Sequence, residues 1–324
     1  MSTLEANETG IPGDLVRHPN LTYPSSTVPF LWDIVEARIK ELNERGIDGR
    51  GVKVGVMDTG WSSHTHLKEP FYLKDFTGSR FGTRDMNGHG SWCNGRIVGN
   101  GGIGIAPGAD IAHLKVLGDN GSGRTDWSDK GRLDAARRGC HLLSVSIGGG
   151  CLDDGSLEDS MRRANELGTL LEIDAAGNSG FNGRTNTIDC PGKAVTGFAV
   201  GATDQNGVIS GFSSGGEQLD VACPGERVIS CSHTGSGWST LSGTSMATPF
   251  FAGIMALVVQ KRRQNGVPDS DMIGAVAWRE FFQREGIYDR AMEDAGRAGK
   301  DASYGMGKPV IYHLIEWIGD YNFA

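Results

Sequence analysis

The sequence lacks an apolar run long enough to cross a membrane. Its longest, residues 250–259, has about ten residues, whereas a helix across a bilayer needs about 20. Residues 1–10 (MSTLEANETG) also lack the basic and then apolar stretches of a secretory signal peptide. We therefore expect a cytoplasmic protein that does not contact a membrane, and release by a route without a signal peptide stays open.

Positive charge and paired cysteine motifs are also scarce. Lys and Arg number 31 against 39 Asp and Glu, which gives a formal net charge of −8. An acidic chain repels phosphate backbones, so nucleic acid is not an expected partner. The six cysteines form no CxxC pair. Their spacing is therefore more typical of reduced, buried thiols than of a disulfide framework.

Glycine, in contrast, is abundant, at 50 of 324 residues. Hydrophobic residues at 38% and charged residues at 22% suffice for a sizeable core and exclude disorder. Residues 1–28 contain three prolines and show no sustained periodicity, so we expect an irregular N-terminal extension. Residues 29–324 are expected to form one domain.

Strand and helix patterns alternate along this domain. Val52, Val54 and Val56 predict a strand, and the segment 246–262 is apolar on all sides, as expected of a helix inside the core. Such alternation predicts an α/β fold with a mostly parallel sheet and helices on both faces. Further elements are expected as a helix over 34–45 and as buried strands over 111–117, 142–147, 169–176 and 194–202.

Three short segments each place a reactive residue type beside glycine. They are Val54–Gly60 (VGVMDTG), Asn87–Ser91 (NGHGS) and Gly243–Pro249 (GTSMATP). Asp58, at the end of a buried strand, could orient an imidazole, His89 could open a helix, and Ser245 could begin the buried helix, where backbone N–H groups stabilise an oxyanion. Taken singly, a turn Asp, a structural His and a helix-capping Ser are the ordinary interpretations.

Taken together, the order and the flanking residues resemble those of the subtilisin-like serine proteases, over about residues 29–312. The resemblance implies a three-layer α/β domain and a serine endopeptidase that forms an acyl-enzyme. It implies that Asp58 orients the general base His89 and that Ser245 is the nucleophile. The segment Ala175–Gly180 (AAGNSG) implies that the Asn178 amide helps to bind the oxyanion.

Two glycine-rich segments, Leu117–Gly123 and Ser146–Gly149, resemble the segments of that family that flank an extended substrate peptide. Pairing with a peptide backbone needs close approach, which glycine permits. The resemblance therefore implies protein or peptide substrates and a set of substrate-binding residues, which are Ser122, Gly123, Ser146, Ile147, Gly148, Gly149, Ala176, Gly177 and Asp189.

Asp189 is singled out by counting. In the family, the floor of the primary pocket lies about eleven residues beyond the oxyanion Asn, and here that position is Asp189. A carboxylate in a partly dry pocket would favour Arg or Lys before the scissile bond. One insertion would shift this register, so a surface-turn Asp, or one paired with Arg184, is the alternative.

Some positions depart from the family pattern. His66 stands where the family often has a calcium-binding Asp, and the loop after His89 is short. We therefore expect the strong calcium site of the family to be absent, and a weaker calcium site stays open. No cofactor is required. Cys93 resembles the thiol near the catalytic His of the proteinase K branch. Residues 1–28 resemble the short leader of intracellular members, so the resemblance implies that they could be a short prosegment.

Three other functions fit parts of the sequence. Residues 99–104 (GNGGIG) satisfy the dinucleotide fingerprint, but they precede Pro107 and do not follow a strand. His64, His66, His89 and Asp58 could suggest a metal hydrolase, yet no HExxH spacing is present. A non-catalytic peptide-binding or scaffold protein on the same fold is the remaining alternative.

Overall fold

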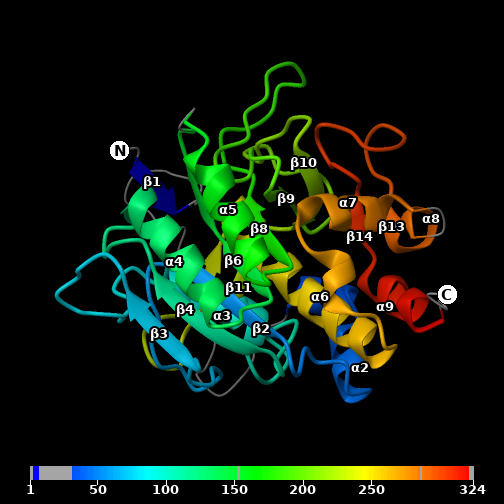
Figure 1. Cartoon of the computed structure of the whole chain (residues 1–324). Coiled ribbons are helices and arrows are strands. Elements are labelled where there is room, and N and C mark those ends of the chain that lie inside the picture. The colour runs from blue at the N-terminus through cyan, green and yellow to red at the C-terminus, as the bar shows by residue number, and fades with distance from the viewer. Residues whose placement is uncertain (1–2, 7–30, 152–153, 285–286, 321–324) are drawn as a thin grey trace.

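The computed structural model describes residues 3–6, 31–151, 154–284 and 287–320 (Figure 1). The strands are β1 Thr3–Ala6, β2 Lys53–Asp58, β3 Tyr72–Asp75, β4 Asp110–Lys115, β5 Ser122–Arg124, β6 Leu142–Val145, β7 Ile147–Gly149, β8 Leu171–Ala175, β9 Phe198–Thr203, β10 Leu219–Pro224, β11 Val228–Cys231, β12 Trp238–Leu241, β13 Met292–Glu293 and β14 Lys308–Pro309. The helices are α1 Trp32–Glu36, α2 Ile39–Glu44, α3 His89–Val98, α4 Thr125–Arg137, α5 Ser156–Glu166, α6 Thr244–Gln264, η1 Asp269–Met272, α7 Ala275–Gln283, α8 Tyr288–Ala291 and α9 Ile311–Asp320.

A seven-stranded sheet in the order β10-β9-β8-β6-β2-β4-β3 forms the middle layer. All of its neighbouring strands pair in parallel, as the sequence predicts. Strand β2 has β4 on one side and β6 on the other: the chain runs from β2 to the edge strand β3, returns to β4, and then crosses to β6 and continues outward to β10. Ligands of such sheets bind at the carboxyl ends of the strands where the order diverges. This rule points to the end of β2, where Asp58 lies.

Helices cover both faces of the sheet (Figure 1). Val54 and Val56 point into one core with α3 and α6, whereas Met57 points into a second core with α4. The alternation of side chains along a strand produces this division. Helix α6 is buried along most of its length, as its uniformly apolar sequence predicts. The three-layer α/β fold is therefore confirmed.

The local elements differ from the sequence predictions in a few places. The helix expected over 34–45 is split into α1 and α2, because Arg38 takes a left-handed conformation with φ 54°. Strands β3 and β10 and the hairpin β11–β12 were not predicted. Of the extension expected over residues 1–28, residues 3–6 form a strand, and the rest lies outside the described residues.

The cysteine prediction is wrong for two of the six residues. Cys151 and Cys190 form a disulfide, while Cys93, Cys140, Cys223 and Cys231 are free and buried. Sequence spacing could not reveal this pair, because 39 positions separate its members and the fold brings them together.

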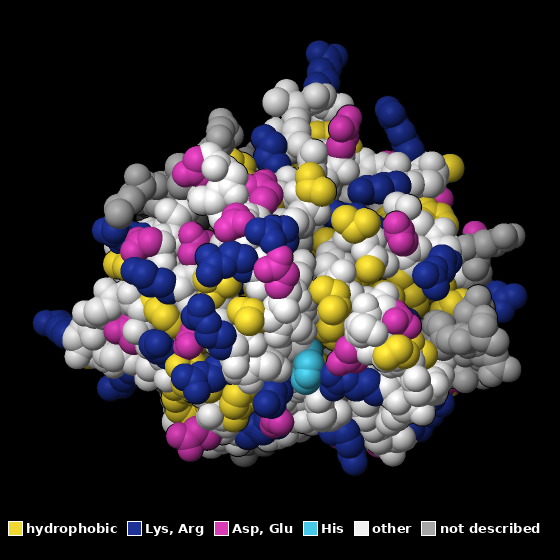
Figure 2. Space-filling view, viewed as in Figure 1, with side chains coloured by type: hydrophobic (Ala, Val, Ile, Leu, Met, Phe, Trp, Pro, Cys, Tyr) yellow, Lys and Arg dark blue, Asp and Glu magenta, His cyan; other side chains and the backbone are white. Residues whose placement is uncertain are grey.

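The surface carries mixed charges. Figure 2 shows Lys and Arg interspersed with Asp and Glu on the face that displays α4 and α5. Arg162, for example, pairs with both Asp159 and Glu166 on α5. Among the described residues, no helix combines the length and the apolar character needed to cross a membrane.

Candidate active site

Asp58 and His89 meet at the carboxyl end of β2. Asp58 is the last residue of this strand and His89 the first residue of α3, and both side chains are fully buried. His89 Nδ1 lies 2.8 Å from Asp58 Oδ1 and 3.0 Å from Oδ2. The backbone N–H of Thr59 donates to the same Oδ1 at 2.7 Å. This geometry fixes the ring of His89 with Nδ1 toward the carboxylate, so Nε2 faces away from it.

The two groups stabilise each other's charge. Burial opposes ionisation of both, but their mutual attraction outweighs it, so the pKa of Asp58 is lowered and that of His89 is raised well above its ordinary value. A second buried histidine, His113, accepts the Gly60 N–H at 3.1 Å. Burial lowers the pKa of His113 to about 4, so this ring is neutral and supports the turn after Asp58.

Asp85 is a positioning residue that the sequence analysis missed. One of its carboxylate oxygens accepts the Thr59 hydroxyl at 2.9 Å and the Gly88 N–H at 2.8 Å, and the other accepts the Ser91 N–H at 2.7 Å. Its negative charge therefore lies at the N-terminus of α3, where the helix dipole favours it. Asp85 thus joins the turn after β2 to the helix that begins with His89. An acidic residue four positions before His89 was the available signal.

Ser245 lies in the first turn of α6, as predicted, and a proline shapes this turn. Pro249 has no N–H, so it cannot form the helical hydrogen bond to the carbonyl of Ser245. That carbonyl instead accepts the hydroxyl of Ser146 at 3.0 Å. The Ser245 hydroxyl in turn donates to the Ser146 carbonyl at 3.3 Å. Cys93 on α3 also contacts this turn, with its Sγ 3.8 Å from the Ser245 carbonyl.

Asn178 is held with its amide nitrogen unused. Its Oδ1 accepts the Thr244 N–H at 2.9 Å and the Thr244 hydroxyl at 3.1 Å. Its Nδ2 is buried and donates to none of the described groups. A buried amide N–H without an acceptor is costly unless a ligand supplies one. Asn178, anchored to the residue before Ser245, therefore offers a donor for an oxygen bound beside Ser245.

The two predicted substrate segments lie on either side of a strand from the N-terminus. They form β5 and β7, and β1 pairs antiparallel with both. Leu4 lies opposite Gly123 on one side and Gly149 on the other. A Cβ on Gly123 would lie 2.7 Å from the Val116 carbonyl, so only glycine fits there. An extended peptide segment thus occupies the groove in which an extended substrate was expected.

Asp189 lies against the wall that Ala176 and Gly177 form. Its N–H donates to the Ala176 carbonyl at 2.9 Å, and a Cβ on Gly177 would lie 2.5 Å from Asp189 Oδ2. Among the described residues no ion pair joins Asp189 to a cationic side chain, Arg184 included. Burial raises the pKa of Asp189 to about 6. The carboxylate is therefore half-buried, unpaired and adjacent to the predicted substrate-binding residues.

His66, which stands where the family often has a calcium-binding Asp, offers ring nitrogens rather than carboxylate oxygens. His66 Nδ1 lies 3.1 Å from the Asn100 carbonyl, and its ring centroid is 5.1 Å from that of Trp238. Calcium prefers six to eight oxygen ligands. Within the described chain, the one group of side chains close enough to hold a metal is Asp58, His89 and Cys93, so His64 and His66 do not join His89.

The dinucleotide fingerprint over 99–104 lies in a turn that follows helix α3 and precedes a proline. A Cβ on Gly104 would lie 2.3 Å from the Gly99 nitrogen, so these glycines permit a close crossing of the backbone. The strand that must precede a nucleotide-binding loop is absent here, since a helix occupies that place.

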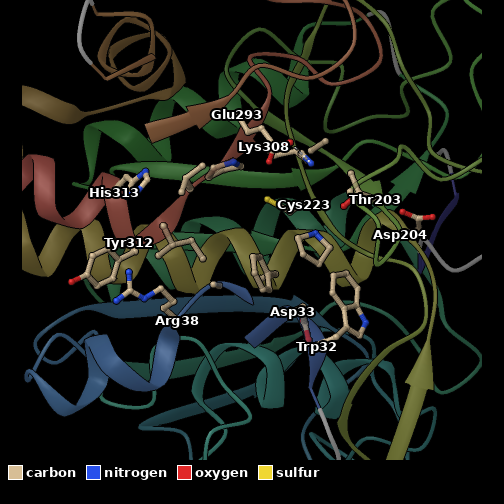
Figure 3. A pocket seen from close by; sticks show the side chains of 18 residues that line it. Trp32, Asp33, Arg38, Thr203, Asp204, Cys223, Glu293, Lys308, Tyr312 and His313 are labelled. Atoms are coloured by element: carbon tan, nitrogen blue, oxygen red, sulfur yellow. Dashed lines mark ion pairs between the residues drawn. The ribbon is translucent and has the colours of Figure 1, made fainter. Parts of the chain in front are cut away.

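A separate cavity of about 180 Å³ lies between α1, β10 and the start of α9 (Figure 3). Trp32, Cys223 and Tyr312 are among its lining residues, and none of the residues Asp58, His89 or Ser245 lines it. Two of its charged residues, Glu293 and Lys308, pair with each other at 2.9 Å. This cavity is therefore separate from the site at the end of β2.

Comparison with known proteins supplies the family. Residues 49–307 match the model of the subtilase family, a segment that contains Asp58, His89, Asn178 and Ser245. The chain belongs to the subtilase family. As a subtilase it carries its candidate triad in the order Asp, His, Ser, with Asn178 between His and Ser.

Relatives include M-protease of Shouchella clausii, 38% identical over 245 residues, and Subtilisin Savinase of Lederbergia lenta, 38% identical over 234 residues. The matches cover 74% of this chain and 62% of M-protease, and 71% of this chain and 84% of Subtilisin Savinase. Subtilisin DY of Bacillus licheniformis is 36% identical over 244 residues, covering 73% of this chain and 86% of that protein.

These subtilase relatives correct the expected location. Together with the alkaline protease of Alkalihalobacillus alcalophilus, 38% identical over 245 residues, they point against a cytoplasmic location, so that prediction is wrong. That prediction depended on residues 1–10, whose composition alone does not determine where a protein is found. The Cys151–Cys190 disulfide also differs from what is usual in a reducing cytosol.

Proposed function

We propose that this subtilase is a serine endopeptidase that hydrolyses peptide bonds through Asp58, His89 and Ser245. The observation that carries the proposal is the fully buried contact between His89 Nδ1 and the Asp58 carboxylate at 2.8 Å and 3.0 Å. An imidazole held in this way can accept a proton at Nε2 and keep the resulting charge stabilised. The unused amide donor of Asn178 beside Thr244 and Ser245 supports the same reaction.

In this mechanism Ser245 Oγ attacks the carbonyl carbon of the substrate while its proton passes to His89 Nε2. The Asn178 amide and the Ser245 backbone N–H donate to the oxyanion. His89 then gives the proton to the leaving amine, and the C–N bond breaks to leave an acyl-enzyme. A water molecule, deprotonated by His89, attacks the ester, and the proton returns to Ser245 Oγ as the acid product leaves.

Substrates are proteins or peptides with Arg or Lys before the scissile bond. The unpaired Asp189 carboxylate supports this preference, because a cationic side chain would neutralise a half-buried charge that has no other partner. Arg should gain more than Lys if both carboxylate oxygens accept its planar group. The formal net charge of −8 argues against nucleic-acid partners.

The N-terminal segment acts as a short inhibitory prosegment. Strand β1 lies between β5 and β7, and an extended substrate would need the same backbone partners. Removal of residues 1–6 should therefore lower KM for a peptide substrate and abolish any lag before full activity. An unchanged KM would show that β1 does not compete with substrate.

No cofactor takes part in this mechanism. Because His66 and Asn100 offer a poor donor set for calcium, a chelator should leave the melting temperature nearly unchanged. A large fall that added calcium reverses would show a calcium site elsewhere in the chain.

The test of the catalytic proposal is covalent labelling. A phosphonyl fluoride should modify Ser245 and stop peptide cleavage, and Ser245→Ala should remove nearly all turnover. Ser270→Ala, an exposed serine on η1, serves as the matched control and should stay fully active. A peptide-binding protein without activity, which the occupied groove would also suit, would retain peptides but take no label at Ser245. That result would overturn the proposal.

A further inference from the structure

The Cys151–Cys190 disulfide joins the end of β7 to the segment that contains Asp189. Cys151 follows β7 by two residues, and Cys190 directly follows Asp189. Gly149 and Cys190 also exchange two backbone hydrogen bonds, each 3.1 Å long. The disulfide therefore lies next to the point where β7 meets the segment that carries the Asp189 carboxylate.

Beyond Ile147, the β7 side of this link is held by backbone hydrogen bonds rather than by side-chain packing. Gly148, Gly149 and Gly150 precede Cys151, and glycine has the greatest backbone freedom of any residue. A Cβ on Gly150 would meet no atom within 4 Å, so this position lies in open space. The disulfide thus adds a covalent restraint to a wall where side chains supply little packing.

The Asp189 side of the link transmits any movement directly. Asp189 accepts the Lys193 N–H at 2.9 Å through its carbonyl and donates to Ala176 through its own N–H, so its backbone sits in a tight turn. Cys190, which is almost completely buried, shares a peptide bond with Asp189. A shift of Cys190 on loss of the disulfide would therefore displace the carboxylate from the Gly177 wall.

We propose that the Cys151–Cys190 disulfide is a specificity-determining clamp, which holds Asp189 in register with β7 so that the pocket selects Arg or Lys. This inference rests on the proposed function, in particular on Asp189 as the pocket floor. Charge-assisted hydrogen bonds depend on direction, and a displacement of about 1 Å can cost about 10²-fold in rate. Contacts with an apolar side chain are less directional. Opening the disulfide should therefore reduce cleavage after Arg more than cleavage after Leu.

The disulfide is open to a small dithiol. Cys151 is exposed and, together with Cys190, lines a surface cavity of about 470 Å³. A thiolate of the reductant attacks the Cys151 sulfur, and Cys190 leaves as a thiolate that takes up a proton. The second thiol of the reductant then displaces Cys151. Two electrons and two protons pass to the protein, and the reductant closes to its own disulfide.

The experiment measures kcat/KM for two peptides that differ only in Arg or Leu before the scissile bond. It compares the oxidised parent, the parent reduced with dithiothreitol, and the double variant Cys151→Ser/Cys190→Ser. Mass spectrometry follows the state of the disulfide, and labelling of Ser245 counts intact active sites. The double variant treated with dithiothreitol is the matched control, since it has no disulfide to reduce between these positions.

Loss of the disulfide should lower the Arg to Leu ratio of kcat/KM about tenfold, with labelling of Ser245 unchanged. The reduced parent gives this result even if the double variant fails to fold. An unchanged ratio with a broken disulfide, or an equal loss for both peptides, would overturn the clamp while leaving the proposed function standing. An oxidised parent that cleaves neither peptide and takes no label would overturn the proposed function itself.

Discussion

The ionisation of Asp189 should be visible in the substrate preference. Burial raises the pKa of this carboxyl group to about 6, inside the pH range in which a protease can be assayed. A group with that pKa is about 90% ionised at pH 7 and about 10% ionised at pH 5. Because the ionised form is the one that attracts a cationic side chain, the preference for Arg over Leu should fall about tenfold between these two pH values.

The ratio of two substrates isolates this effect from the titration of His89. The pKa of His89 is raised well above its ordinary value, so its protonation lowers kcat/KM for every substrate as the pH falls. Two fluorogenic peptides that differ only in Arg or Leu, assayed in the same enzyme sample from pH 4.5 to 8, share that loss. Their ratio therefore reports the free-enzyme titration of Asp189 alone.

The matched variant is Asp189→Asn, which keeps the shape of the side chain but cannot ionise. Its Arg to Leu ratio should be low and independent of pH. Two results would refute the reasoning. One is a parent whose preference for Arg stays constant from pH 5 to 7, and the other is a variant that keeps the parent's profile.

Other predictions concern Asn178, Cys93 and Asp174. Asn178→Ala removes one oxyanion donor and should lower kcat by about 10²–10³-fold with little change in KM, and a change confined to KM would place Asn178 in ground-state binding. Cys93 is a buried thiol 3.8 Å from His89 Nδ1, so Cys93→Ala should stay active and should abolish inhibition by a mercurial, whereas inhibition that persists would point to another thiol. Burial and the nearby Glu172 raise the pKa of Asp174 well above that of the unfolded chain, so stability of the parent should fall as the pH rises from about 4 through the folded pKa. Asp174→Asn should remove that fall. The melting temperature of the variant minus that of the parent should therefore grow from pH 4 to pH 8, and a constant difference would contradict the raised pKa of Asp174.

The sequence was most informative where local chemistry and burial agree. The alternating valines before Asp58 predicted β2 and its end, and the uniformly apolar stretch after Ser245 predicted α6, because these periodicities arise from the elements themselves. Counting along a single loop placed Asp189 near Ala176 and Gly177, where the structure has it, and its role in substrate preference stays a prediction.

Features that depend on pairing between distant segments could not be predicted. Strand β1 has no strong pattern of its own, and its partners β5 and β7 define it. The disulfide needs Gly149 and Cys190 to lie side by side, which only the assembled sheet provides. The role of Asp85 likewise depends on a fold that brings Thr59 beside the start of α3.

The proline in α6 has a mechanical consequence. Because Pro249 leaves the Ser245 carbonyl to the hydroxyl of Ser146, helix α6 is tied sideways to the residue that precedes β7. A displacement of β7 is therefore coupled to Ser245 through this hydrogen bond rather than along the helix axis. This hydrogen bond opposes a separation of Ser245 from the β7 side of the groove.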